Sequence, residues 1–302
     1  MSDNEIAVSR LSKSYRNVQA VEHLSFVVEP GRVTGFLGPN GAGKKTTLRM
    51  MLGLVSPSSG TVRFGGRSYA DMPAPLREVG SLLDANDVHG ARTGRDHLRI
   101  MCPMGGINSR RVDEVLELVD LTQAARRRVK GYSLGMRQRL GIAKAMLGNP
   151  RVLILDEPAN GLDPDGIRWL RKLLRGLADD GRTVLVSSHL LGEMQLMADD
   201  VIIIARGRLI QQGSLAQVIS SATGAMSHVR SPQADVLQQA LLSAGAEVER
   251  QGPGLLLVGN CDMPQIGRLA LDVRAEIHEL RPVEVDLESA FFRLTEGKAG
   301  IR

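Results

Sequence analysis

The segment Gly38–Thr46 constrains the fold of this chain more than any other feature. It reads Gly-Pro-Asn-Gly-Ala-Gly-Lys-Lys-Thr, and it joins an apolar run predicted as a strand (32–37) to a segment with a helical pattern (46–55). Glycines let the backbone wrap around phosphate oxygens with its N–H groups pointing inward. Lys44 supplies a mobile positive charge, and the helix adds its positive end. A phosphate-binding loop requires this strand–loop–helix order, whereas a glycine-rich turn that binds no ligand does not require it.

We therefore predict that the loop binds a nucleotide phosphate chain. The predicted binding residues are Gly38, Pro39, Asn40, Gly41, Ala42, Gly43, Lys44, Lys45, Thr46 and Thr47.

One position of this loop departs from the expected pattern. The residue after the lysine is normally Ser or Thr, whose hydroxyl ligates Mg²⁺. Here that residue is Lys45, and an ammonium group has only donors, so it cannot ligate a cation. A small shift would let Thr46 take this place, although Thr46 lies one residue further round the helix and faces elsewhere.

Two neighbouring carboxylates follow a second apolar run. Val152–Leu155 has the composition of a strand buried on both faces, and Asp156 and Glu157 come directly after it. Carboxylates at the end of a buried strand are costly unless they bind something. We expect Asp156 to hold magnesium, directly or through water, and Glu157 to polarise an attacking water. The alternative is an acidic helix cap, because Pro158 and Asn160 follow.

The order of the predicted elements divides the chain in two. Strands alternate with helices up to about residue 220, which predicts a parallel sheet covered on both faces, with a mostly helical segment at about 90–148. Small polar residues at 220–224 suggest a boundary. Beyond it a strand–helix–strand–strand–helix–strand order suits a ferredoxin-like sandwich. Its predicted elements are 227–230, 235–244, 247–250, 255–258, 264–272 and 276–280, with a last helix at 287–295.

Composition excludes several classes of protein. At roughly 100–200 residues per domain, 302 residues suit two domains. Aromatic residues make up only 3% and the net charge is +5, so we expect no nucleic-acid partner. Two cysteines outside any CxxC pattern indicate no disulfide framework or metal site. The acidic start, Met1–Glu5, is unlike a signal peptide, and no segment is apolar enough to span a membrane. We therefore expect a cytoplasmic chain.

A third segment, Tyr132–Arg139, completes a recognisable series. In order, the chain carries Tyr15, the phosphate loop, this segment, the two carboxylates, Asn160–Asp163 and His189. Residues 5–220 thereby resemble an ATP-binding cassette (ABC) ATPase. The family's signature loop reads LSGGQ. Ser133 and Gly135 match that pattern, whereas Leu134 and Met136 depart from it.

The resemblance implies ATP and Mg²⁺ as ligands and gives further residues a role. Tyr15 would stack on adenine, and His189 would contact the γ-phosphate and hold Glu157 with the attacking water. Asp84 stands where the family usually has a glutamine that contacts the metal. Asp163 would organise the loop of a partner cassette.

The resemblance also implies an assembly. In a homodimer or paired cassette, Ser133 and Gly135 of one chain would close over the ATP held by Lys44 of the other, and closure would move a separate integral-membrane permease. The chain would then lie peripherally on the inner face of the cell membrane. The segments 38–51, 79–84, 160–164 and 286–294 are most similar to ATP-binding subunits of bacterial drug or antibiotic exporters.

We therefore expect an α/β fold: an ABC-type P-loop ATPase domain at 1–220, with its helical subdomain, and an accessory or regulatory ferredoxin-like domain at 225–302. Two alternatives remain open at this point. One is a hydrolysis-impaired or regulatory nucleotide-binding subunit, because of Lys45. The other is a non-transport cassette acting on ribosomes or DNA, although such proteins usually carry two cassettes or a long coiled coil, and this chain shows one cassette and no heptad run.

Overall fold

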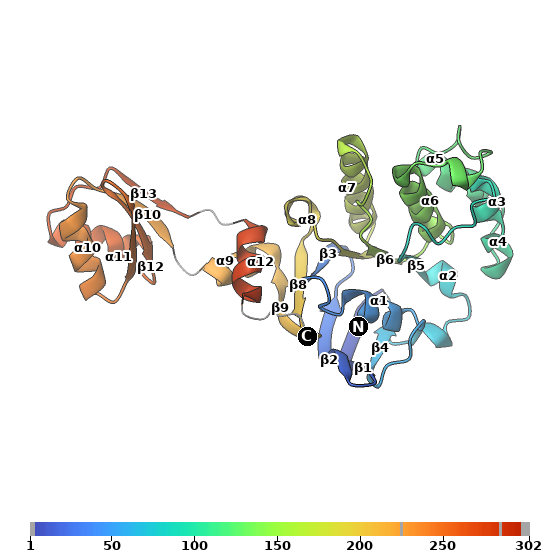
Figure 1. The fold of residues 1–302 in the computed structure, drawn as a ribbon, viewed down its shortest axis with the longest axis horizontal. Helices are drawn as coiled ribbons and strands as arrows, with labels where there is room; N and C mark the ends of the chain where they lie inside the picture. Colours follow the sequence, from blue (N-terminus) through green and yellow to red (C-terminus); the bar gives the residue numbers. More distant parts are fainter. Residues whose placement is uncertain (1–3, 224–225, 284–285, 297–302) are drawn as a thin grey trace. The chain divides into compact units, whose positions relative to one another are not determined.

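The computed structural model describes residues 4–223, 226–283 and 286–296 (Figure 1). The chain forms two compact units: one runs to Leu215 and takes in Thr295, and the other spans Ala216–Leu294. The acidic start, Met1–Asp3, and part of the predicted boundary, at 224–225, lie outside the described residues.

A six-stranded sheet forms the centre of the first unit. Its strand order is β5-β6-β7-β3-β8-β9, in which all neighbours run parallel except the β8–β9 pair at one edge. The predicted parallel α/β sheet is thus confirmed. Because parallel strands end at one edge, the loops after β3, β6 and β7 emerge together. The strands are β5 (Val79–Leu82), β6 (Val152–Asp156), β7 (Thr183–Ser187), β3 (Arg32–Leu37), β8 (Asp200–Ala205) and β9 (Arg208–Ser214).

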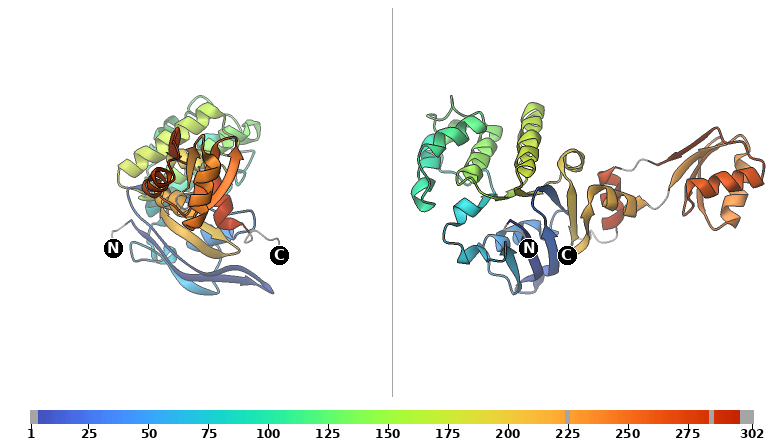
Figure 2. Two further views of the ribbon diagram at one scale, coloured as in Figure 1. Left: turned by 90° about the vertical axis from the view of Figure 1, so that its left-hand side faces the viewer. Right: turned by 180° about the vertical axis from the view of Figure 1, so that it is seen from behind.

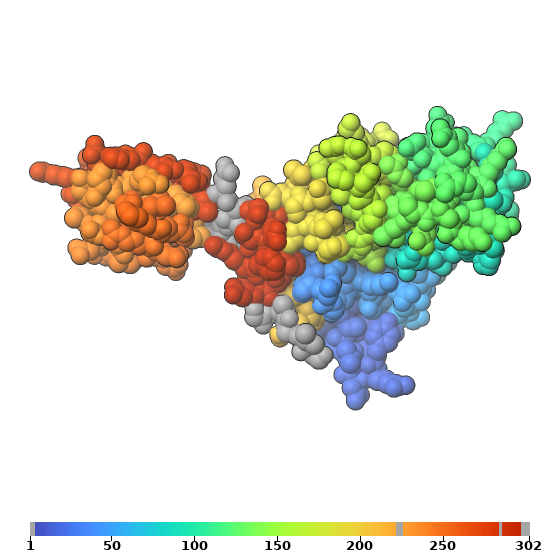
Figure 3. All heavy atoms as spheres, turned by 45° about the horizontal axis from the view of Figure 1, so that its top comes forward, coloured from blue at the N-terminus to red at the C-terminus, as the bar shows by residue number. Residues whose placement is uncertain are grey.

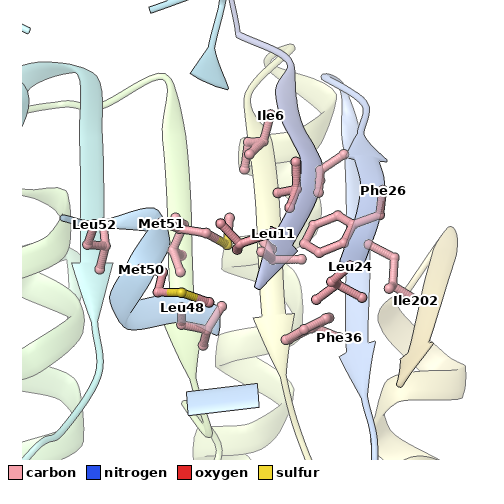
Figure 4. Packing of buried hydrophobic residues seen from close by; sticks show 14 of the residues in the cluster. Ile6, Leu11, Leu24, Phe26, Phe36, Leu48, Met50, Met51, Leu52 and Ile202 are labelled. Carbon is pink, nitrogen blue, oxygen red and sulfur yellow. The ribbon is translucent and has the colours of Figure 1, made fainter. Parts of the chain in front are cut away.

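A second, antiparallel sheet lies beside the first and holds the helix after the phosphate loop. It has the order β2-β1-β4, formed by β2 (Val18–Val28), β1 (Ile6–Tyr15) and β4 (Ser59–Phe64). Helix α1 (Lys44–Met51) buries Leu48, Met50 and Met51 in the core shared by the two sheets (Figure 4). The helix ends earlier than the predicted Val55, because Gly53 adopts a φ of +68° and turns the chain.

The remaining helices of this unit cover the six-stranded sheet and extend from it. Those between residues 94 and 146 form one continuous body (green in Figure 3), and the predicted helical segment is confirmed with interruptions. The helices are α2 (Pro75–Glu78), α3 (Gly94–Arg99), α4 (Met101–Met104), α5 (Arg111–Leu118), α6 (Leu134–Met146), α7 (Pro164–Asp179) and α8 (Leu191–Met197), with 3₁₀ turns η1 (Tyr69–Asp71) and η2 (Val129–Gly131).

The second unit contains a ferredoxin-like sandwich, as predicted. Its antiparallel sheet has the order β11-β12-β10-β13, and α10 and α11 cover one face (Figures 1 and 2). The last strand starts three residues later than predicted, because its partner β10 offers only four residues for pairing. The elements are β10 (Ser227–Arg230), α10 (Ala234–Ser243), β11 (Glu247–Gly252), β12 (Leu255–Gly259), α11 (Met263–Asp272) and β13 (Glu279–Pro282).

Two further helices, α9 (Leu215–Thr223) and α12 (Leu287–Thr295), flank this sandwich in sequence and lie side by side (Figures 1 and 2). Helix α12 has the predicted bounds, whereas α9 falls where small polar residues suggested a boundary. Burial explains the difference, because α9 carries the fully buried Val218 and α12 carries the buried Leu287, Ala290 and Phe291. Among the described residues, no helix combines the length and apolar character needed to cross a bilayer.

One buried histidine makes the stability of the helical part depend on pH. His97 in α3 is 7% exposed, and neither ring nitrogen has a hydrogen-bond partner among the described residues. Burial lowers the pKa of His97, and the positive charges of Lys144 and Arg92 lower it further, while Asp87 acts in the opposite direction. The unfolded chain therefore binds a proton at a higher pH than the folded one.

We predict that the chain loses stability as the pH falls below about 6.5, the ordinary pKa of histidine, since the unfolded state then gains a proton that the folded state resists. His97→Phe should flatten this dependence, which thermal unfolding at pH 7.5 and pH 5.5 would measure. The matched control is His89→Phe, at an exposed position. An equal loss of melting temperature in wild type and His97→Phe would assign the effect to other groups.

Candidate active site

The phosphate loop runs from the end of β3 into α1, and its shape depends on glycine at two positions. Gly43 adopts a φ of +99°, and a β-carbon there would lie 2.6 Å from the carbonyl oxygen of Ala20. A β-carbon on Gly38 would lie 2.5 Å from the carbonyl oxygen of Ile204. Any side chain at either position would therefore push the loop away from the strands that support it.

Lys44 is the first residue of α1, and its side chain folds back over the loop. Its amine donates to the carbonyl oxygens of Gly38 and, at 3.3 Å, Pro39. Burial lowers the pKa of Lys44, while Glu157 and Asp156 raise it. The ammonium group is thus held above the loop backbone by carbonyl groups, facing two carboxylates.

Asp156 is the last residue of β6, beside Ser187 at the end of β7. The Ser187 hydroxyl donates to Asp156 Oδ1. Burial raises the pKa of Asp156, whereas the hydrogen bond from Ser187 and the charges of Lys45 and Lys44 lower it. The positive charges of both loop lysines therefore act on the Asp156 carboxylate.

Glu157 occupies a strained position directly after the strand. Its φ is +50°, unusual for a residue with a side chain, and its amide donates to the carbonyl oxygen of Ser187 at 3.1 Å. The Glu157 carboxylate lies 2.7 Å from Nδ1 of His189 and accepts a hydrogen bond from the His189 amide at 3.3 Å. The two predicted catalytic residues are thus in direct contact.

Gln138 supports this geometry, although sequence reasoning gave it no role. It is buried in α6, and its side-chain amide donates to the carbonyl oxygen of Glu157 at 2.9 Å. This contact joins the helix of the signature segment to the strained backbone of Glu157. The only sequence signal was the position of Gln138 within that segment.

A cavity of about 500 Å³ brings the loop and both carboxylates together. Of the predicted site residues, those lining it are Pro39, Asn40, Gly41, Ala42, Gly43, Lys44, Lys45, Thr46, Asp156 and Glu157. Its other lining residues are Val18, Gln19, Ala20 and Arg206, from the start of β2 and the β8–β9 turn. Sequence reasoning missed these four, because nothing in the sequence places those turns beside the loop.

Of the predicted binding residues outside the signature segment and Asp163, three do not line this cavity: Tyr15, Gly38 and Thr47. Tyr15 is 46% exposed and pairs across the β1–β2 hairpin with Val18, which does line it, while Lys13 Nζ lies 5.1 Å from the Tyr15 ring centroid. Thr47 is fully buried, and its hydroxyl donates to the carbonyl oxygen of Gly43 at 2.9 Å. The Thr47 hydroxyl therefore stabilises the backbone of the loop. Contact of Tyr15 with adenine stays a prediction.

The signature residues lie in a separate cavity of about 660 Å³. Ser133, Gly135 and Asp163 line it, and none of the residues around it also lines the loop cavity. Ser133 caps α6 and Asp163 caps α7 by accepting hydrogen bonds from backbone amides. Leu134, which replaces a signature glycine, sits so close to Gly161 that a β-carbon on Gly161 would lie 2.3 Å from its Cγ.

Asp84 lies in a third cavity, of about 580 Å³. It is exposed, and its Oδ1 accepts a hydrogen bond from the Asn86 amide at 2.8 Å. Lys45 lines both this cavity and the loop cavity. The structure thus places Lys45 between Asp84 and Asp156, the two predicted metal ligands.

The donor set around the loop does not fit Mg²⁺, which is bound by oxygen ligands in octahedral geometry. The position for the loop hydroxyl holds the ammonium of Lys45, and the Thr47 hydroxyl is bonded to backbone. Beside Lys45 the cavity offers the carboxylate of Asp156, the hydroxyl of Thr46 and the neutral amide oxygens of Asn40 and Gln19, while Glu157 is bonded to His189. Within the described part of the chain, no group of three or more His, Cys, Asp or Glu residues could hold a metal.

Comparisons with known proteins agree with this geometry. Residues 21–160 match the family model described as ABC transporter, and residues 227–288 match a Domain of unknown function (DUF8746). The chain is similar to the uncharacterized ABC transporter ATP-binding protein YhcH of Bacillus subtilis (38% identity, covering 96% of this chain and 95% of YhcH). It is also similar to the bacitracin transport ATP-binding protein BcrA of Bacillus licheniformis (43% identity over 68% of this chain and 69% of BcrA).

A solved structure shares the fold of the cassette. It is a dimeric ATP-binding cassette in a post-hydrolysis state bound to ADP and Pi, with a TM-score of 0.62 and 21% identity over 70% of this chain and 98% of that one. The likeness shows that the two chains share a fold. The loop geometry, the paired carboxylates and the full-length similarity to YhcH lead to one conclusion: the chain belongs to the ATP-binding subunits of ABC transporters, a family of P-loop ATPases.

Proposed function

We propose that this subunit binds and hydrolyses ATP to power the transport of an antibiotic-type compound through a separate membrane permease. The observation that carries the ATPase part is the cavity in which Lys44 faces Asp156 and the Glu157–His189 pair. The similarity to BcrA supports the antibiotic part.

Glu157 is the proposed general base. Its carboxylate needs a fixed direction to polarise a water towards the γ-phosphate. The Ser187 carbonyl and the Gln138 side chain hold the backbone of Glu157, and the His189 ring contacts the carboxylate itself. His189 is largely exposed beside the cavity, so it can reach the γ-phosphate while holding Glu157. Lys44 would bind the terminal phosphates, with the N–H groups of the loop around them.

A single chain carries only half of each proposed catalytic site. Ser133, Gly135 and Asp163 line a cavity separate from that of Lys44, which supports assigning them to the nucleotide of another cassette. We infer a homodimer, or a pair with a similar cassette, that closes over two nucleotides. Coupled to a permease, this dimer would lie on the inner face of the membrane, and the ferredoxin-like unit would regulate it or dock it.

Magnesium is the cofactor that this family implies, but the loop does not offer the hydroxyl that it needs. This observation favours a second candidate function, a nucleotide-binding subunit with slow magnesium-dependent hydrolysis. Two unit charges about 4 Å apart repel by roughly 4 kcal/mol at an effective dielectric of 20, and a third of that energy weakens binding about tenfold. Lys45 therefore sets which of the two functions dominates.

We predict that Lys45→Thr raises magnesium-dependent ATP turnover about tenfold or more, because it removes the repulsion and restores a ligand. Lys45→Met separates these two effects, since it removes the charge without adding an oxygen. Phosphate release at saturating ATP measures both variants against wild type. Equal turnover in wild type and Lys45→Thr would show that Thr46 or water already serves as the ligand.

We further predict that Glu157→Gln, made in the Lys45→Thr background, lowers turnover at least about 100-fold and leaves ATP binding intact, because only water activation is lost. Glu117→Gln is the matched control, since Glu117 is exposed on α5. ATP hydrolysis and ATP binding are measured on the same samples. Undiminished hydrolysis would remove Glu157 from the role of base.

The antibiotic assignment has its own test in a host that lacks the gene for this chain. Bacitracin resistance should return with wild type and at least as fully with Lys45→Thr, but not with Lys44→Ala, which loses the charge that binds phosphate. The minimal inhibitory concentration of bacitracin is the measurement, and protein levels on immunoblots are the control. If the level of bacitracin resistance is the same with wild type, Lys45→Thr and Lys44→Ala, this subunit does not act on bacitracin, whatever its ATPase activity.

A further inference from the structure

We propose that the ammonium group of Lys45 takes the place of the divalent cation, so that this subunit binds ATP without magnesium. This inference rests on the proposed ATP binding at the loop. In the bound state Lys45 would bridge Asp156 and the β- and γ-phosphate oxygens, which is the position that a metal ion would otherwise occupy. The nucleotide would then be free ATP rather than its magnesium complex.

The first argument is where Lys45 lies. It is the second residue of α1, exposed, and lines the cavity that also contains Lys44, Asp156 and Glu157. It is close enough to Asp156 for its charge to stabilise that carboxylate. A long side chain at this position reaches the space beside the loop without any change in the backbone.

The second argument is that no contact among the described residues holds the Lys45 ammonium group in place. Among the described residues it makes no hydrogen bond or ion pair, whereas Lys44 is tied to the carbonyl groups of Gly38 and Pro39. Its ammonium carries three donors, which suits an environment of phosphate and carboxylate oxygens. Lys45 can therefore turn towards a bound triphosphate, while Lys44 stays above the loop.

The third argument is charge balance. With a hydroxyl residue at position 45, the charges of Lys44 and Arg206 would be cancelled by those of Asp156 and Glu157, and the cavity would carry no net positive charge for a triphosphate. Lys45 adds a third positive charge, so the lining of the cavity carries a net charge of +1. The protein itself thus supplies part of the charge that a metal would bring, and a divalent ion there would meet repulsion from Lys45.

The remaining oxygen groups agree with this assignment. The Thr47 hydroxyl is bonded to Gly43, and Asp84 lies in a different cavity with its Oδ1 bonded to the Asn86 amide. A metal in the loop cavity would thus depend on Asp156, on the neutral oxygens of Thr46, Asn40 and Gln19, and on water and phosphate. An ammonium group needs only hydrogen-bond acceptors around it, whereas Mg²⁺ needs an octahedral shell of oxygen ligands.

The test is a titration of the full chain with ATP by calorimetry, once in EDTA and once in excess Mg²⁺. For wild type we expect dissociation constants within about twofold of each other, and for Lys45→Thr and Lys45→Ser a gain of about tenfold or more with Mg²⁺. Lys45→Met should weaken binding in EDTA about tenfold, because it removes the substitute charge. Lys130→Thr, at an exposed position outside the cavity, is the control and should resemble wild type.

The outcomes are distinguishable. If Mg²⁺ tightens binding to wild type as much as to Lys45→Thr, or if Lys45→Met binds as well as wild type in EDTA, the inference is overturned and the proposed function stands. If wild type, Lys45→Thr and the control all fail to bind ATP in either buffer, the proposed function fails and the inference with it. Circular dichroism of each variant shows that these differences do not come from unfolding.

Discussion

The contact between the ends of β6 and β7 is the interaction on which the site depends. Ser187 donates through its hydroxyl to Asp156, and its backbone carbonyl accepts the amide of Glu157. One residue therefore holds the carboxylate of Asp156 and the backbone of Glu157. This is possible because the parallel register places Asp156 directly beside Ser187. Both acidic residues line the cavity of the phosphate loop.

Much of this arrangement could be predicted from the sequence, because it follows from local patterns. The apolar run 152–155 and the glycines of the loop predict a buried strand and a phosphate loop without any knowledge of long-range contacts. The strand order of the ferredoxin-like sandwich likewise follows from the succession of its elements.

Other features depend on tertiary packing and therefore escaped prediction. Gln138 gains its role only because α6 lies against the turn after β6, and Arg206 lines the cavity only because the β8–β9 hairpin folds beside the loop. Helix α9 begins with apolar residues and extends into the small polar residues at its end, and Val218 within it is fully buried. In each case the deciding partner is far away in the sequence, and the sequence alone does not identify it.

The close packing of Leu134 over Gly161 has a consequence for how this subunit can change. Leu134 is the first residue of α6, whereas Gly161 lies in the turn before α7 and adopts a φ of +75°, so a side chain at position 161 meets both strain and a steric clash. A smaller residue at position 134 would relieve the clash but not the backbone strain. The start of α6 and the turn before α7 are therefore coupled by shape, and a change of size at one position alters what the other can accept.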